Sequence, residues 1–267
     1  VTAGEDLTGM EDRLVKLASL GIAHLVVEMG GAVARPCVHV VFGPGNNGAD
    51  AVYAGLELAA RGFPVRYYAT FAAPAAKGAV QALLDAGGLP DVVWHDPVRP
   101  WTEMPASAIA PGDVVLDGVL GIGASGPPRE PAAAAIRFVN RLKGRARILA
   151  VDVPSGLDAD TGAAPGDVVA ADVTLCMGLP KVGFANPAAL RFCGSVHVHD
   201  LAMPEALAAG GGDLARDELV AARDVARCVP RRAWDAHKGD FGHVCVVGGC
   251  ARVEPGGEAG AEGGGGG

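Results

Sequence analysis

The chain has 267 residues, half of them hydrophobic, with 40 glycines, 19 prolines and a formal net charge of −8 at pH 7. Glycine and proline together make up about a fifth of the chain, less than in low-complexity or collagen-like sequences, so a globular protein is expected. The basic residues form no long cluster, which argues against nucleic acid or an anionic membrane as partner and favours small molecules or protein surfaces.

The six cysteines are scattered and include no CxxC pair, a pattern typical of reduced thiols in a cytoplasmic protein. The first residues lack the basic and apolar segments of a signal peptide, and no run of about 18 uncharged apolar residues occurs in the sequence. We therefore expect a cytoplasmic protein that does not span a membrane.

The elements predicted in chain order alternate between helices and strands. The first is a helix at Met10–Ala34, either continuous or divided at Gly21, because apolar residues recur at helical spacing. A buried strand at Cys37–Phe42 and a helix at Ala49–Arg61 follow. The further strands are Val65–Ala69, Val92–His95, Val114–Leu120, Ile148–Val153, Val173–Met177 and Val196–His199, and the further helices are Ala75–Leu84 and Pro131–Leu142.

This alternation predicts an α/β fold, doubly wound, with a mostly parallel sheet covered on both faces. Ligands of such sheets bind beyond the carboxyl ends of the strands. The Ala/Gly-rich stretch Ala208–Asp213 predicts a linker, after which a helix near Asp217 and a strand at Val244–Val247 begin a second domain. The Gly-rich residues beyond Cys250 are expected to be disordered, because they cannot bury a core.

The loop after the first strand, from Gly43 to Asp50, reads G-x-G-x-x-G, a turn whose backbone N–H groups can hold a phosphate at a helix N-terminus. A tight turn capped by Asn47 or Asp50 explains the same pattern. A dinucleotide-dependent dehydrogenase also needs an acidic residue at the end of the second strand, where this chain has Thr70. Because the acidic residue is missing, a dehydrogenase is disfavoured. Asn46, Asn47 and Asp50 are instead expected to touch a ligand or an ion directly.

Two further loops place carboxylates at the ends of strands. Asp117 precedes a second G-x-G-x-x-G stretch, and a buried carboxylate there needs a hydrogen-bond partner or a cation, unless it only caps a turn. Asp152 stands where a general acid or base is expected, with a capping role as the alternative. Ser155 lies outside a G-x-S-x-G motif, which disfavours a serine hydrolase. Lys181 faces the same edge of a parallel sheet, unless it is a solvated surface lysine.

Three segments in this order, Val40–Asp50, Val115–Gly123 and Ala150–Gly162, resemble the NAD(P)H-hydrate epimerase family. Its domain, of the YjeF N-terminal type, forms the N-terminal half of bifunctional NAD(P)H-hydrate repair enzymes. The resemblance extends from about Met10 to Pro204. It implies a Rossmann-like three-layer α/β/α sandwich, interconversion of the R and S forms of hydrated NADH and NADPH, and a bound potassium ion.

Carried onto this chain, the resemblance implies one catalytic residue, a set of potassium ligands and a substrate lining. Asp152 would bind the substrate and move the proton while the carbon–oxygen bond at the hydrated carbon breaks and re-forms. Asn47, Asp117 and Ser155 would face potassium, and Lys181 matches the family's late strand. The residues that would line the substrate are Asn46, Asn47, Gly48, Ala49, Asp50, Gly121, Ile122, Gly123, Ala124, Ser125, Gly126, Pro127 and Asp152.

The resemblance also divides the chain, into an epimerase domain at 10–205, a linker at 206–216, an incomplete start of a ribokinase-like dehydratase domain at 217–250 and a Gly-rich tail at 251–267. No dehydratase activity is expected from so short a second part. The chain departs from the family pattern at Ala49 and Ala51, where glycines are usual. A homodimer is implied only by the resemblance. The alternatives are a non-catalytic nucleotide-binding module and a dinucleotide-dependent oxidoreductase.

Overall fold

The computed structural model describes residues 7–29, 35–76, 78–85, 87–89, 91–202, 222–228 and 234–237. The chain separates into two compact units, Val1–Asp217 and Glu218–Gly267. In the second unit the structure describes the helix α7 (Ala222–Cys228). The strand predicted at Val244–Val247, the linker at 206–216 and the tail at 251–267 lie outside the described residues.

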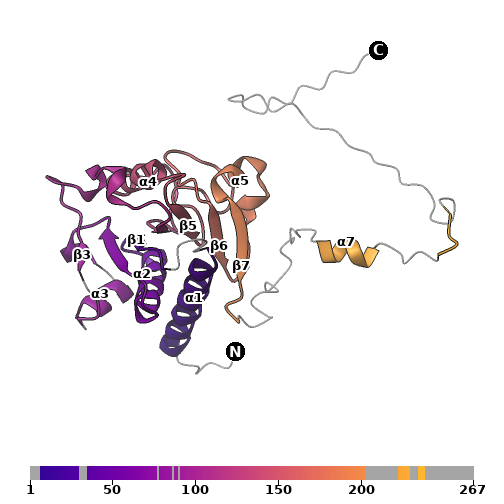
Figure 1. Ribbon diagram of the computed structural model, residues 1–267, viewed down its shortest axis with the longest axis horizontal. Helices are drawn as coiled ribbons and strands as arrows, with labels where there is room; N and C mark the ends of the chain where they lie inside the picture. Colours follow the sequence, from indigo (N-terminus) through magenta and orange to yellow (C-terminus); the bar gives the residue numbers. More distant parts are fainter. Residues whose placement is uncertain are drawn as a thin grey trace, which may run out of the picture. The chain divides into compact units, whose positions relative to one another are not determined.

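One all-parallel sheet forms the centre of the first unit (Figure 1). Within the described residues it has seven strands in the order β3-β2-β1-β4-β5-β6-β7. The order reverses beside β1, and ligands of open α/β sheets bind beyond the strand ends at such a reversal. The strands are β1 (Val38–Phe42), β2 (Val65–Ala69), β3 (Val92–Val93), β4 (Val114–Gly118), β5 (Arg147–Val151), β6 (Val173–Met177) and β7 (Ser195–His199).

The central strands β1 and β4 are buried along their whole length because helices cover both faces of the sheet. On one face, α1 (Leu7–Met29), α2 (Asn46–Ala60) and α3 (Gly78–Asp85) pack against a cluster that includes Val40 and Leu116. On the other, α4 (Ala132–Arg141) packs against a cluster that includes Val41 and Val115. Figure 1 shows α4 and α5 (Pro187–Cys193) on the face opposite α1 and α2. The predicted three-layer α/β/α sandwich is confirmed.

The first helix is continuous through Gly21, so of the two predicted possibilities the undivided helix is confirmed. A Cβ atom at Gly21 would lie 2.5 Å from the ring of His199 at the end of β7. The ring's Nε2 in turn hydrogen-bonds the carbonyl oxygen of Leu17 at 2.9 Å. Gly21 therefore lets the helix approach the edge of the sheet closely and does not break it.

Several helices differ from the prediction. The helix α1 begins at Leu7 rather than Met10, and α3 begins at Gly78 rather than Ala75, where Ala73–Ala75 forms a short 3-10 helix. The second helix, α2, begins at Asn46 rather than Ala49, because Asn-Asn-Gly, which reads as a turn, forms its first turn. The seven-residue helix α5 is absent from the elements predicted from the sequence. It begins where the Asn186 side chain accepts a hydrogen bond from the Ala188 N–H, with Pro187 at its first position.

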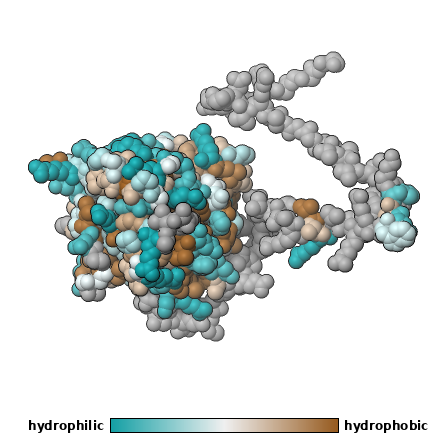
Figure 2. Space-filling view, in the orientation of Figure 1, coloured by the Kyte–Doolittle hydropathy of each residue, from teal (hydrophilic) through white to brown (hydrophobic). Residues whose placement is uncertain are grey.

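The strand β7 forms one edge of the sheet, and Val196 and Val198 on it are 38% and 49% exposed. Hydrophobic surface is visible on that side of the first unit in Figure 2, among hydrophilic areas. None of the helices in the described part of the chain is both long and apolar enough to cross a bilayer.

Candidate active site

The loops that follow β1 and β4 touch at the carboxyl edge of the sheet through glycine backbone. The N–H of Gly43 donates to the carbonyl oxygen of Gly118 at 3.1 Å. A Cβ atom at Gly43 would lie 2.1 Å from the carbonyl oxygen of Val119, and one at Gly48 would lie 2.1 Å from that of Gly43. No side chain fits at these positions, so Gly43 permits close packing between the two loops and Gly48 permits the tight turn between β1 and α2.

Asp117, at the end of β4, is wholly buried and is held by the loop after β5. Its Oδ1 accepts a 2.6 Å hydrogen bond from Ser155 Oγ, and its Oδ2 accepts one of 2.9 Å from the Ser155 N–H. The N–H of Val119 donates to Oδ1 at 3.3 Å. Burial raises the pKa of Asp117 to about 6, against the lowering effect of the Ser155 hydrogen bonds. These donors are neutral, and no ion pair to Asp117 occurs among the described residues.

Asn47 joins this cluster through the backbone of Leu120. The Asn47 side-chain nitrogen donates to the carbonyl oxygen of Leu120 at 2.9 Å, and the Leu120 N–H donates to Ser155 Oγ at 2.8 Å. The structure thus brings together Asn47 in the first turn of α2, Asp117 near the end of β4 and Ser155 in the loop after β5, which are 38 or more positions apart in sequence. The side chains offer oxygen atoms beside a buried carboxyl, the chemistry that suits a hard cation.

Asp152, the first residue after β5, has a backbone φ of +66°. Left-handed backbone at a residue other than glycine is uncommon, although Asp tolerates it better than most, and such conformations cluster at functional sites. Its Oδ1 lies 2.6 Å from the Lys181 ammonium nitrogen and accepts a 2.9 Å hydrogen bond from the Met177 N–H. Lys181 is therefore partnered with the candidate catalytic carboxylate and is not a solvated surface lysine.

Asp50 adds a second carboxyl group to this region. It lies in the second turn of α2, three positions after Asn47, a spacing that puts both residues on the same side of the helix. Burial, with a further effect of the Asp152 charge, raises the pKa of Asp50 to about 7. The sequence predicted contact between Asp50 and a ligand but did not indicate its electrostatic coupling to Asp152. That coupling depends on the packing of α2 beside β5.

The predicted substrate lining divides into a buried part and an exposed part. Gly48 and Ala49 are buried in the first turn of α2, so they have only backbone atoms to offer a ligand. Ala51 is also buried, and its methyl group packs against Gly118. Most of the loop at 121–127 is exposed, and Ile122 is 61% exposed at the edge of the sheet. An apolar side chain so placed is available to contact a bound molecule.

Comparison with known proteins places the chain in a family. The family model described as YjeF-related protein N-terminus matches residues 11–183, which contain all three loops of the site. The chain belongs to this family.

Among the relatives of this YjeF-related domain is the bifunctional NAD(P)H-hydrate repair enzyme Nnr of Methanothermobacter thermautotrophicus, 35% identical over 83% of this chain and 41% of the relative. The enzymes of the same name from Thermofilum pendens and Coxiella burnetii are 31% and 32% identical, over 94% and 79% of this chain and 46% and 41% of theirs. The chain spans less than half the length of these relatives. The crystal structure of the yeast protein YNL200c shares the fold, with a TM-score of 0.56 and 21% identity over 66% of this chain and 74% of that chain.

Proposed function

We propose that this YjeF-related domain interconverts the R and S epimers of hydrated NADH and NADPH. The names of its relatives, NAD(P)H-hydrate repair enzymes, give the substrate class. The observation that carries the proposal is the pair of carboxyl groups at the carboxyl edge of the sheet, Asp152 ion-paired with Lys181 and Asp50 with its raised pKa.

Epimerisation at a carbon that bears a hydroxyl group needs one proton donor and one acceptor. When the carbon–oxygen bond breaks, a proton must reach the departing oxygen so that it leaves as water. When water adds to the other face, it must lose a proton. Asp50, with a pKa of about 7, holds a proton for part of the time near neutral pH and can supply it. Asp152, as the carboxylate of an ion pair, can accept the second proton.

We also propose that Asn47, Asp117 and Ser155 hold the potassium ion. Asp117 is wholly buried and its hydrogen-bond donors are neutral, so a monovalent cation would balance its charge. The Ser155 hydroxyl contacts Asp117 directly, and Asn47 is linked to Ser155 through the backbone of Leu120. A bound cation would supply positive charge beside the substrate and keep the loops after β1, β4 and β5 together. Even without the ion, the side chains of Asn47 and Ser155 link these loops, because both form hydrogen bonds to the backbone of Leu120.

The test adds the purified full chain to the R epimer of NADPH hydrate, in potassium or sodium buffer, and follows the S epimer by chromatography against the spontaneous rate. We expect acceleration that is greater in potassium. Asp152→Asn is expected to abolish it, whereas Asp85→Asn, which alters an exposed carboxylate of α3, should leave it unchanged. If the wild-type chain binds NADPH hydrate without accelerating epimerisation, the domain is a binding module and the proposal is wrong.

A cytoplasmic location and a homodimer are further parts of this proposal. The cysteines of the described residues, Cys37, Cys176, Cys193 and Cys228, are free, in keeping with a reducing compartment. The dimer rests on the resemblance to the family, and light scattering after size-exclusion chromatography of the full chain tests it.

A further inference from the structure

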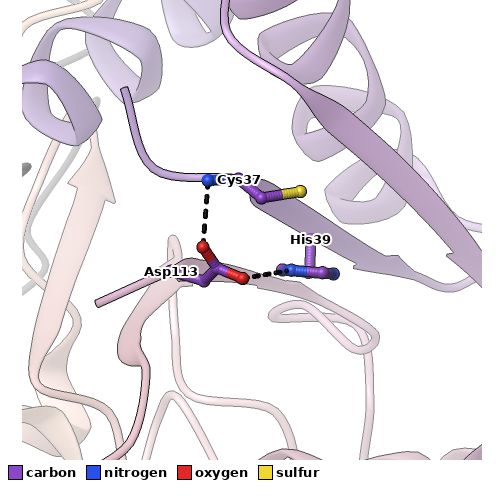
Figure 3. Close-up of side chains that lie close together, drawn as sticks. All are labelled: Cys37, His39 and Asp113. Atoms are coloured by element: carbon purple, nitrogen blue, oxygen red, sulfur yellow. Dashed lines mark hydrogen bonds and ion pairs between the residues drawn. The ribbon is translucent and has the colours of Figure 1, made fainter. Parts of the chain in front are cut away.

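A second group of ligand atoms lies at the amino end of the strands, opposite the candidate active site. Cys37 immediately precedes β1, His39 is its second residue, and Asp113 immediately precedes β4. The pairing of Val38 with Val114 in the parallel ladder sets Cys37 beside Asp113. Cys37 and His39 are two positions apart in extended chain, so their side chains project to the same face. Figure 3 shows the three side chains meeting there.

The three side chains offer one sulfur, one nitrogen and one oxygen ligand, and these atoms all lie within 4.8 Å of one another. In a tetrahedral zinc site, bonds of about 2.0 to 2.3 Å put neighbouring ligand atoms about 3.3 to 3.8 Å apart. A modest contraction of the cluster therefore produces such a site. Mixed sulfur, nitrogen and oxygen ligands favour zinc-like metals over potassium, magnesium or calcium.

Hydrogen bonds from neighbouring groups hold the side chains of Asp113 and His39 in place and leave lone pairs on them that can bind a metal. Oδ1 of Asp113 accepts a 3.1 Å hydrogen bond from the Cys37 N–H. Oδ2 of Asp113 accepts a 3.0 Å hydrogen bond from the Ala110 N–H and lies 3.0 Å from His39 Nε2. The other ring nitrogen of His39, Nδ1, faces the Tyr68 hydroxyl at 3.4 Å. When a metal binds Nε2, the ring proton lies on Nδ1, and the Tyr68 hydroxyl oxygen can accept a hydrogen bond from it. The other ring nitrogen of a metal-bound histidine commonly donates such a hydrogen bond.

Access and charge also bear on the site. His39 and Asp113 are buried, at 3% and 7% exposure, whereas Cys37 is half-buried and opens the cluster to solvent. The charge of the exposed Arg66 acts on the Cys37 thiol, and the Arg66 side chain must stay clear of the sulfur when the sulfur binds a metal. Thiolate and carboxylate then match the double charge of the ion, and the thiol proton is released.

We propose that Cys37, His39 and Asp113 form a binding site for a divalent metal ion of the zinc class, separate from the candidate active site. Water from the open side completes the coordination, since three protein ligands leave one tetrahedral position free. The alternative is that His39 and Asp113 form a structural hydrogen bond that ties β1 to β4 and binds no metal.

The experiment titrates the metal-free full chain with Co²⁺, a spectroscopic substitute for zinc, and records visible absorption and the near-ultraviolet thiolate-to-cobalt band. We expect one equivalent to bind, with displacement by Zn²⁺. Cys37→Ser should remove the thiolate band and weaken Zn²⁺ binding at least about tenfold. Cys228→Ser, which changes an exposed thiol of α7, is the matched control and should keep both signals.

Asp113→Asn should weaken binding as well, and its thermal unfolding shows whether it is folded. A wild-type chain with no thiolate band, or a band that survives Cys37→Ser, overturns the proposal. The absorption signal does not depend on turnover, so its outcome is independent of the epimerase assay.

Discussion

The Asp152 carboxylate and the Lys181 ammonium lie 2.6 Å apart, joining the first residue after β5 to the loop after β6. Both side chains are mostly buried, at 13% and 15% exposure, so water screens the pair only weakly. The same carboxylate accepts a hydrogen bond from the Met177 N–H. Asp152 contacts both Lys181 and Met177 while its backbone is left-handed. The local structure thus fixes the orientation of one carboxylate very closely.

Asp152→Asn should abolish epimerisation while leaving the fold intact. Asparagine tolerates a φ of +66° as well as aspartate does, and its side-chain oxygen can still accept the Met177 N–H. The amide cannot accept a proton, so we expect a fall in kcat of at least about 100-fold. Turnover and a thermal unfolding curve, measured on the same sample, check both parts. An active variant would show that another group accepts the proton.

Lys181→Met should reduce both stability and turnover, because it leaves the Asp152 charge mostly buried without its cation. We expect a loss of about 1 to 3 kcal/mol in the free energy of unfolding, less than for a fully buried pair. Lys181→Arg keeps the positive charge and should recover much of the stability. Urea unfolding of the three proteins measures this. Equal stability of the methionine variant would mean that the pair contributes nothing net.

The pKa of Asp50 predicts how activity changes with pH. If protonated Asp50 supplies the proton to the departing oxygen, kcat/KM should fall as the pH rises above about 7. Asp50→Asn should lower the rate and remove this decline, because the amide does not titrate. The pH profiles of the two proteins provide the comparison. A decline that persists unchanged in Asp50→Asn would assign it to another group.

The same carboxyl group links stability to pH. The pKa of Asp50 is higher in the folded chain, at about 7, than its ordinary value of 3.8, so between these values the folded protein binds more protons than the unfolded one. The free energy of unfolding should therefore fall as the pH rises through this window. Asp117, with a pKa of about 6, acts in the same direction. Denaturant unfolding of wild type and Asp50→Asn across this range should show a shallower fall in the variant.

Ser155→Ala should raise the potassium concentration needed for full activity. The change removes a hydroxyl group that donates to Asp117 at 2.6 Å and accepts from Leu120, so a buried carboxyl loses a partner, at a cost of about 1 to 3 kcal/mol. Potassium titrations of turnover and of thermal stability measure the effect. Ser195→Ala, at the exposed start of β7, is the control. An unchanged potassium requirement in Ser155→Ala would remove Ser155 from the proposed ligand set.

Gly21→Ala should destabilise the protein, although alanine alone favours a helix by about 1 kcal/mol over glycine. The new methyl group would lie 2.5 Å from the His199 ring, and forcing such a contact costs about 1 to 3 kcal/mol. Urea unfolding should show the loss, and His199→Ala in the same chain should reverse it. A stabilised single variant would mean that the ring moves aside freely.

The elements that the sequence predicts well are those whose signal is local. The strand β2, at Val65–Ala69, is predicted to the residue because Gly62 and Pro64 end the helix before it and an apolar run fills it. The helix α5 is missed because it has only seven residues and lies within a loop region. Periodicity needs a longer segment to be visible.

The candidate site residues could be selected from their positions after strands, but their partners in the structure could not be predicted. Asp152 and Lys181 meet because β5 and β6 are neighbours in the sheet, and Asp50 approaches Asp152 because of how α2 packs. Asp113 and His39 are 74 positions apart, and only the pairing of β1 with β4 brings them together. Sheet order and register are properties of the whole chain, which no single motif contains.

The contact between the glycines after β1 and β4 also bears on how this domain can change its ligand. A side chain at Gly43 or Gly48 would collide with backbone, so these positions cannot take part in a change of specificity. The exposed loop at 121–127 has no such constraint over most of its length, and exposed loops tolerate substitution. Laboratory selection for a new nucleotide preference should therefore yield mutations around Ile122 and none at Gly43 or Gly48.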